Sequence, residues 1–138
     1  MPIDIEQLVK ELKRDEGFRD KVYQCTAGKL TCGFGHNLED GTIPEYVAES
    51  LLAHDIAVHL QECEDFPWFS TLSDVRKRVI INMMFNMGKG RLMGFKRMIE
   101  AINDENWEWA ATEMTDSIWF HQVGDRAKRL VAMMRDDK

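Results

Sequence analysis

The sequence has few cysteines and prolines and no long hydrophobic run. Its 138 residues include three cysteines, none of them in a CxxC pair, so any disulfide scheme leaves one thiol over. We therefore expect reduced thiols. No apolar run approaches the roughly 18 residues of a membrane span, and we expect no stable membrane insertion. No repeat and no Pro/Gly-rich linker divides the chain, so a single domain is expected.

Two further absences concern targeting and metals. The first residues lack both a basic region and an apolar region, so we expect no secretory signal and a cytoplasmic location. His54, His59 and Cys63 fall in one predicted helix. The step of five residues between the two histidines places them about 140° apart on a helix, which is unsuited to a shared ligand. We therefore expect no bound metal.

The charges are unevenly distributed along an acidic chain. The formal net charge is −6 at pH 7, and residues 39–65 carry eight acids and no Lys or Arg. Residues 71–99 carry seven bases and one acid, Asp74. The overall acidity argues against nucleic-acid binding, which usually needs a basic surface. The basic stretch could steer a polyanion, but a solvated helix face is the favoured interpretation.

Periodicity and capping signals predict a mainly helical α+β protein. Asp4 as N-cap and Gly17 as the stop predict a helix that ends at Glu16. Short β-like runs at residues 22–25 and 29–34 flank a turn and predict a hairpin. After Pro44 the pattern is helical, with segments predicted over residues 44–65, 75–87, 95–103, 107–114 and 126–134.

Glu16 is a candidate general acid because of its place at the end of the first predicted helix. A carboxylate in the last turn faces the negative end of the helix dipole, which disfavours the ionised form. A group that keeps its proton near neutral pH can donate it to a leaving group. By position alone, Glu16 would be interpreted as an ordinary surface glutamate. The neighbouring residues therefore determine whether the interpretation as a general acid is favoured.

Glu16, Cys25 and Thr31 are separated by eight and five residues, and Gly33-Phe34-Gly35-His36 follows. This pattern resembles the phage lysozyme family, glycoside hydrolase family 24, whose active-site spacing is Glu, eight residues, Asp or Cys, five residues, Thr. The resemblance continues through residues 81–88 and 125–129. The connection between His36 and Asp55 is shorter than in larger members.

The resemblance implies a lysozyme-like α+β fold with two lobes in a single domain over residues 1–138. Residues 17–43 would form the small β-containing lobe. Residues 66–138 would form the larger helical lobe together with the helix at 4–16. The helix over residues 44–65 would join the two lobes.

The resemblance also implies an acid-catalysed glycosidase that needs no cofactor. Glu16 would protonate the leaving oxygen, and Thr31 would hold a water molecule with a hydroxyl that both donates and accepts. Cys25 stands where many relatives have Asp. An unperturbed thiol is only a few per cent thiolate at pH 7. Whether Cys25 acts as base, nucleophile or spectator therefore stays open.

Further positions carry over from the family pattern by their alignment with it. Asn37, Phe85 and Asn86 would bind substrate. The residues that would support the site are Gly33, Gly35, His36, Asp55 and Arg126. His36 and Asp55 would pair, and Arg126 would approach the carboxyl group of Glu16.

The function implied is that of an endolysin muramidase that cleaves the β-1,4 bond between N-acetylmuramic acid and N-acetylglucosamine. Its partner would be the glycan strands of peptidoglycan, which it would reach from the host cytoplasm through a holin lesion, as a monomer. Two alternatives stay open. One is a lytic transglycosylase, and the other is a catalytically weak glycan-binding protein on the same fold.

Overall fold

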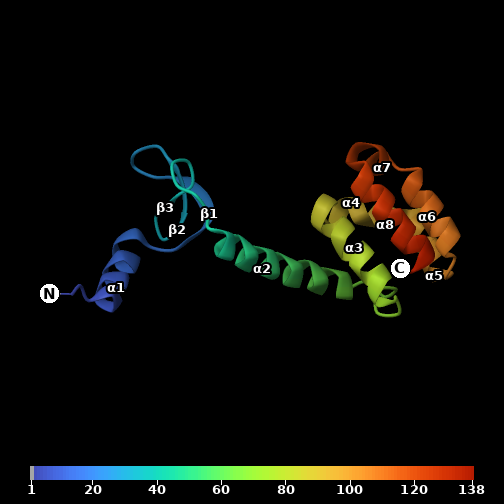
Figure 1. The fold of residues 1–138 in the computed structure, drawn as a ribbon, viewed down its shortest axis with the longest axis horizontal. Helices are drawn as coiled ribbons and strands as arrows, with labels where there is room; N and C mark the ends of the chain where they lie inside the picture. Colours follow the sequence, from blue (N-terminus) through green and yellow to red (C-terminus); the bar gives the residue numbers. More distant parts are fainter. Residues whose placement is uncertain (1) are drawn as a thin grey trace. The chain divides into compact units, whose positions relative to one another are not determined.

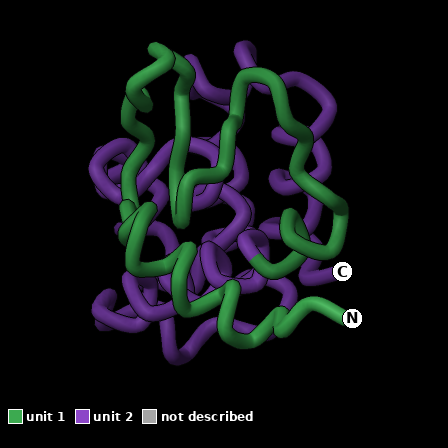
Figure 2. Tube along the Cα trace, turned by 90° about the vertical axis from the view of Figure 1, so that its left-hand side faces the viewer, with its two compact units in different colours: residues 1–50 green, residues 51–138 purple. Residues whose placement is uncertain are grey.

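The computed structural model describes residues 2–138, which are mostly helical with one small antiparallel sheet (Figure 1). The chain divides into two compact units, residues 1–50 and 51–138, coloured separately in Figure 2. We call them unit 1 and unit 2. The α+β class predicted from the sequence is confirmed.

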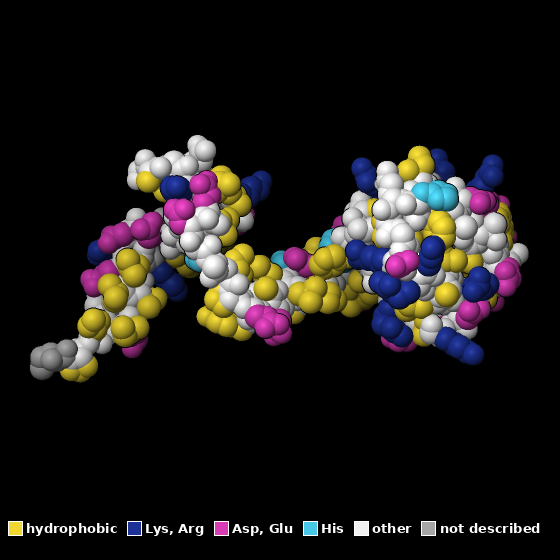
Figure 3. Space-filling view, turned by 45° about the horizontal axis from the view of Figure 1, so that its top comes forward, with side chains coloured by type: hydrophobic (Ala, Val, Ile, Leu, Met, Phe, Trp, Pro, Cys, Tyr) yellow, Lys and Arg dark blue, Asp and Glu magenta, His cyan; other side chains and the backbone are white. Residues whose placement is uncertain are grey.

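Unit 1 begins with helix α1 (Ile5–Glu16). The side chain of Asp4 accepts a hydrogen bond of 3.0 Å from the backbone N–H of Gln7, which is the predicted N-cap. The helix ends where the N–H of Gly17 donates to the Lys13 carbonyl, as the sequence predicts. Hydrophobic side chains lie along the surface of α1 in Figure 3, with Ile5, Val9 and Leu12 exposed.

A three-stranded antiparallel sheet completes the regular structure of unit 1, in the order β1-β2-β3. The strands are β1 (Arg19–Gln24), β2 (Leu30–Gly33) and β3 (His36–Asn37). Thr31 is in the central strand, paired with Tyr23 on one side and with Asn37 on the other. The predicted hairpin is confirmed, and the third strand is an addition that periodicity did not predict.

Helix α2 (Glu45–Glu64) begins in unit 1 and ends in unit 2, close to the predicted bounds of 44–65. The other helices of unit 2 are α3 (Asp74–Met87), α4 (Lys89–Met93), α5 (Lys96–Asn103), α6 (Trp107–Thr115), α7 (Ile118–Val123) and α8 (Asp125–Asp136). The short helices α4 and α7 were not predicted. The predicted division into lobes concerns the arrangement of the units and stays a prediction.

The hydrophobic core of unit 2 is rich in methionine. Five methionine side chains from α3, α5, α6 and α8 have no exposed surface: Met83, Met84, Met98, Met114 and Met134. Unbranched thioether side chains adapt to irregular gaps between helices, so this composition suits a core built from short helices. No helix within residues 2–138 is both long and apolar enough to cross a membrane.

The buried guanidinium of Arg76 ties the start of α3 to the end of α8. Its Nε donates to the Met134 carbonyl at 2.8 Å, and Nη2 donates to the Arg135 carbonyl at 3.3 Å. These are carbonyl groups that the helix itself cannot satisfy. The guanidinium also lies 3.9 Å from the ring centre of Trp107, and Asp137 is 3.6 Å from Nη1.

Candidate active site

The carboxyl group of Glu16 lies against the backbone of Gly35. A Cβ at position 35 would be only 2.7 Å from Glu16 Oε2, and Gly35 has a φ of +77°. Only glycine accepts both the close approach and the left-handed backbone without strain. The turn after β2 therefore provides a seat for the side chain at the end of α1, and two predicted site residues are brought together.

Cys25 and Thr31 are the second pair that the structure brings together. Backbone N–H groups of Lys29 and Ala27 hydrogen-bond to the thiol and lower the pKa of Cys25 below its ordinary value. The hydroxyl of Thr31 adds to this lowering of the pKa, while partial burial opposes it. The surroundings of Cys25 therefore favour the thiolate, the form that can accept a proton or attack carbon.

Thr31 is the one buried side chain among the described residues of unit 1, with 3% of its surface exposed. Its hydroxyl donates to the Lys29 carbonyl at 2.9 Å, and the same carbonyl accepts the backbone N–H of Cys25 at 2.9 Å. A hydroxyl has one proton, so Thr31 can donate either to this carbonyl or to the Cys25 thiolate, and its two lone pairs remain as acceptors. The predicted water-holding role of Thr31 stays a prediction.

The side chain of Asn37 forms hydrogen bonds within its own loop. Its side-chain oxygen accepts the backbone N–H groups of Glu39 and Asp40 at 2.9 and 3.0 Å, and its Nδ2 donates to the Asp40 carboxylate at 3.2 Å. These bonds build the turn that follows β3. The neighbouring His36 is exposed and pairs with Cys32 through the backbone. The structure thus gives Asn37 a role in shaping the loop, and its predicted contact with substrate stays a prediction.

Aromatic and cationic groups lie near Glu16 in the sequence and in the fold. The rings of Phe18 and Phe34 are 5.5 Å apart between centres, and Lys13 Nζ lies 5.4 Å from the centre of the Phe34 ring. Phe34 directly precedes Gly35, the residue against which the Glu16 carboxyl group lies. Gly33, predicted to support the site, is the last residue of β2.

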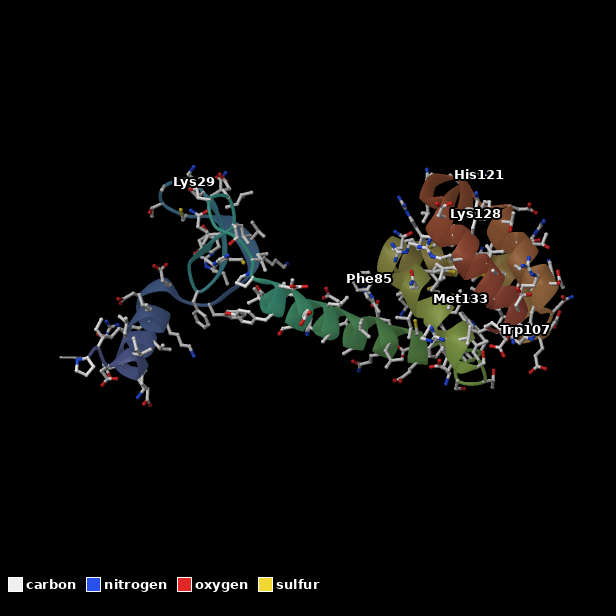
Figure 4. The ribbon with its side chains drawn as sticks, viewed as in Figure 1. Lys29, Phe85, Trp107, His121, Lys128 and Met133 are labelled. Carbon is white, nitrogen blue, oxygen red and sulfur yellow. The ribbon has the colours of Figure 1, made fainter. Side chains whose placement is uncertain are left out.

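In unit 2, Phe85 and Arg126 line one hollow of about 520 Å³. The remaining lining residues are Leu52, Ile56, Arg78, Ile81, Asn82 and Met133. Figure 4 labels Phe85 on α3 and Met133 on α8, two of the helices that form the hollow. The rings of Phe85 and His59 also form a T-shaped pair with a centroid distance of 5.3 Å.

The guanidinium of Arg126 is held by Asn82. Its Nε donates to Asn82 Oδ1 at 2.9 Å, and its Nη2 donates to the Asn82 carbonyl at 3.3 Å. Asp55, half-buried on α2, also belongs to unit 2. The predicted pairs Arg126–Glu16 and Asp55–His36 each join residues of different units, and they stay predictions.

The sequence did not predict that Trp119 holds Asn86. The indole Nε1 of Trp119 donates to Asn86 Oδ1 at 2.8 Å across 33 residues of sequence. Asn82, the partner of Arg126, was also missed. The spacing of Asn82 and Asn86 on one face of α3 is the signal that could have pointed to a polar stripe there.

The chain is similar to phage lysozymes over nearly its whole length. The profile of the family described as "Phage lysozyme" matches residues 13–136. "Probable T4-type lysozyme 1" of Dictyostelium discoideum is 31% identical, over 89% of this chain and 90% of its own. "Endolysin" of Acyrthosiphon pisum secondary endosymbiont phage 1 is 51% identical, over 33% of this chain and 34% of its own.

A further relative is "Pre-baseplate central spike protein Gp5" of Enterobacteria phage T4, which is 27% identical over 92% of this chain but only 27% of its own length. In that relative, the sequence similar to this chain is one part of a longer protein. The family profile spans residues 13–136, and the relative at 31% identity covers nearly all of the chain. The chain therefore belongs to the phage lysozyme family.

Proposed function

We propose that this protein is an endolysin muramidase that hydrolyses the β-1,4 bond between N-acetylmuramic acid and N-acetylglucosamine in peptidoglycan. The observation that carries the proposal is the seating of the Glu16 carboxyl group on Gly35, at the edge of the hairpin that holds Cys25 and Thr31. Family membership supports lysozyme chemistry, and the spacing of the three residues supports this division of roles.

In the proposed reaction, Glu16 protonates the glycosidic oxygen while an oxocarbenium-like transition state forms. The exposed Glu16 side chain lies against Gly35, and keeping the carboxyl group there would lower the cost of aligning it with the leaving oxygen. Thr31 holds the water that completes hydrolysis. The reaction consumes one water and yields a free reducing end on the muramic acid residue.

Cys25 stabilises positive charge or accepts the proton of that water in this proposal. The N–H groups of Lys29 and Ala27 lower the pKa of its thiol, so a larger fraction is thiolate than for an ordinary cysteine. A thiolate can also attack the anomeric carbon directly. Base and nucleophile lead to opposite configurations in the product, so the anomer formed distinguishes them.

The biological setting is also a proposal. The relative named as an endolysin supports a role in lysis of a bacterial host. The chain would accumulate in the host cytoplasm and reach the wall as a monomer once a holin has opened the membrane. Peptidoglycan glycan strands would be its partner, and nucleic acid would not.

A turbidity assay on chloroform-treated Gram-negative cells tests the proposal. We expect the wild-type chain to clear the suspension and Glu16→Gln to lose roughly 10²–10⁴-fold in rate. Asp15→Asn is the matched control, because Asp15 neighbours Glu16 and makes only an exposed ion pair with Arg14. A Glu16→Gln variant with more than about a tenth of the wild-type rate would remove Glu16 from the role of general acid.

Mass spectrometry of the released fragments separates the alternatives. Reducing ends support hydrolysis, whereas 1,6-anhydro ends would identify a lytic transglycosylase that uses the substrate's own hydroxyl in place of water. Glycan strands that bind without being cut would identify a catalytically weak binding protein.

A further inference from the structure

One peptide group in unit 1 makes three hydrogen bonds, two through its carbonyl and one through its N–H. It joins Lys29 to Leu30, at the start of β2. The Lys29 carbonyl accepts the backbone N–H of Cys25 at 2.9 Å and the hydroxyl of Thr31 at 2.9 Å. The Leu30 N–H donates to Glu39 Oε1 at 2.9 Å. Two residues of the predicted site therefore share a peptide group with a carboxylate that the sequence did not single out.

Bonds within the loop that follows β3 hold the Glu39 carboxylate at this N–H. The backbone N–H of Glu39 donates to Asn37 Oδ1 at 2.9 Å, and the N–H of Leu38 donates to the Leu30 carbonyl at 2.8 Å. The second carboxylate oxygen, Oε2, lies 4.0 Å from Nζ of Lys29, which Figure 4 labels. Each oxygen of the carboxylate thus has a partner in the hairpin.

The Thr31 hydroxyl has one proton and two acceptors within reach. It donates to the Lys29 carbonyl, and its hydrogen bond to Cys25 helps to lower the pKa of the thiol by stabilising the thiolate. Only one of these acceptors receives the proton at a time. A thiolate that receives it has one lone pair fewer for a water molecule or a carbon atom. The direction of this proton therefore affects the chemistry proposed for Cys25.

A carboxylate on the N–H side of a peptide group makes the carbonyl a better acceptor. Hydrogen bonds to ionised groups are about twice as strong as neutral ones, and bonds in a chain strengthen one another by roughly 10–30%. The bond from the Leu30 N–H to Glu39 therefore strengthens the bond that the Lys29 carbonyl accepts from Thr31. Asp40 has no such route, because it lies 3.6 Å from Lys29 Nζ and, within residues 2–138, makes no hydrogen bond to this peptide group.

We propose that Glu39 is a positioning residue, which acts through the Lys29–Leu30 peptide group to keep the Thr31 proton on the Lys29 carbonyl and away from the Cys25 thiolate. The lone pairs of the sulfur then stay free for the reaction, and those of the Thr31 hydroxyl can accept a proton from the water that it holds. The inference rests on the proposed function, since it assumes that the thiolate takes part in hydrolysis.

Glu39→Gln tests the inference by titration of Cys25, which needs no catalytic activity. The amide oxygen still accepts the Leu30 N–H, so the loop is kept, but the carbonyl is less polarised. The Thr31 proton then turns more often to the thiolate, so the pH midpoint for iodoacetamide alkylation of Cys25 should fall. In a Thr31→Val background, which lacks this proton, Glu39→Gln should leave the midpoint unchanged. All variants carry Cys32→Ser, and peptide mass spectrometry measures the labelling.

Two simpler effects of Glu39 predict different results. A negative charge that acts directly on the sulfur would, on removal, lower the midpoint equally in both backgrounds. A loosened hairpin, which loses the N–H donors at the thiol, would raise the midpoint in both. Either result overturns the proposal, as does an unchanged midpoint in the parent background.

Asp40→Asn is the matched control. It removes the same charge from the same loop as an equally conservative amide, but Asp40 has no hydrogen bond to the Lys29–Leu30 peptide group within the part of the chain that the structure describes. The alkylation midpoint of Cys25 should therefore stay as in the parent. A fall equal to that of Glu39→Gln would overturn the proposal.

The rate of hydrolysis gives a second readout. A thiolate that receives the Thr31 proton forms more readily but reacts less readily, so the midpoint and the rate should fall together. We expect kcat of Glu39→Gln on soluble peptidoglycan fragments to fall roughly two- to fivefold, the scale on which one hydrogen bond strengthens the next. KM should not change, because Glu39 does not contact substrate in this role. An unchanged kcat, or a change in KM alone, contradicts the proposal.

The two proposals fail in different ways. A wild-type chain that releases no reducing ends from peptidoglycan contradicts the proposed function, whatever the titration of Cys25 shows. A wild-type chain that does release them, while Glu39→Gln shifts the midpoint equally with and without the Thr31 hydroxyl, contradicts this inference alone.

Discussion

Gly35 has no side chain where the carboxyl group of Glu16 lies, since a Cβ there would come within 2.8 Å of the carboxyl carbon. The same glycine has a backbone that L side chains rarely adopt. Position 35 thus controls the place of Glu16 without taking part in chemistry. A side chain introduced at position 35 should therefore affect catalysis by displacing the Glu16 carboxyl group.

We predict that Gly35→Ala lowers the turnover number at least tenfold, because the added methyl group pushes the Glu16 carboxyl group out of its seat. Misplacement by about 1 Å is enough to cost on the order of 100-fold in rate. Gly88→Ala is the matched control, since Gly88 has a similar φ of +84° but nothing within 4 Å of its Cβ position. If Gly35→Ala and Gly88→Ala have equal turnover numbers, backbone strain alone would account for any loss of activity.

The thiol of Cys25 should ionise at a lower pH than an ordinary cysteine. The N–H groups of Lys29 and Ala27 lower its pKa, so the pH midpoint of its alkylation should fall below the ordinary 9.0. Thr31→Val removes a hydroxyl that contributes to the lowering, and should move the midpoint upward. Iodoacetamide labelling of a Cys32→Ser variant, followed by peptide mass spectrometry, measures both. A midpoint at or above 9.0 in the parent would contradict the prediction.

Arg76 should stabilise unit 2 far more than a surface arginine does. Arg76→Met keeps the apolar stem but leaves the Met134 and Arg135 carbonyls without their donor, so the free energy of unfolding should fall by about 2–4 kcal/mol. Arg78→Ala breaks only the exposed bond to Asp74 and should cost less than about 1 kcal/mol. Urea denaturation followed by circular dichroism compares the two. Similar losses of unfolding free energy in the two variants would contradict the prediction.

Cys63 should make the fold sensitive to alkali. Burial, reinforced by the charges of Glu62 and Glu64, raises the pKa of its thiol to about 11 from an ordinary 9.0. The unfolded chain therefore loses this proton first, and the contribution is present below pH 9 and is lost as the pH rises towards 11.

The loss through Cys63 should amount to roughly 2–3 kcal/mol, at 1.36 kcal/mol for each pKa unit. Denaturation curves at pH 8 to 11 measure it as the difference between the parent and Cys63→Ala, which cancels the titration of other groups. Parallel pH profiles of the two proteins would contradict the prediction.

Local signals account for what the sequence predicted well. Asp4 and Gly17 mark the ends of α1 through hydrogen bonds to residues three and four positions away, so the pattern is visible in a short window. Ser73 caps α3 over an equally short distance by accepting the N–H of Arg76, although the prediction of a helix over residues 75–87 did not use it. The spacing of Glu16, Cys25 and Thr31 predicted the candidate site only through its resemblance to a family.

The missed features depend on pairing and packing that hydrophobic periodicity does not record. Strand β3 has two residues and exists because His36 and Asn37 pair with β2, which no periodicity records. The bond between Trp119 and Asn86 spans 33 residues, and the seat of Glu16 on Gly35 depends on where a turn brings the backbone. Such contacts follow from the packing of whole elements, and composition and spacing do not predict them.

The methionine-rich core of unit 2 has a consequence for oxidative damage. Peroxide converts methionine to a polar sulfoxide, which a packed core does not accommodate. The side chains of Met83, Met98 and Met114 have no exposed surface, so an oxidant reaches them only when the helices separate. The rate at which these sulfoxides accumulate would therefore report how often unit 2 opens, and each such event would hinder its return to the native packing.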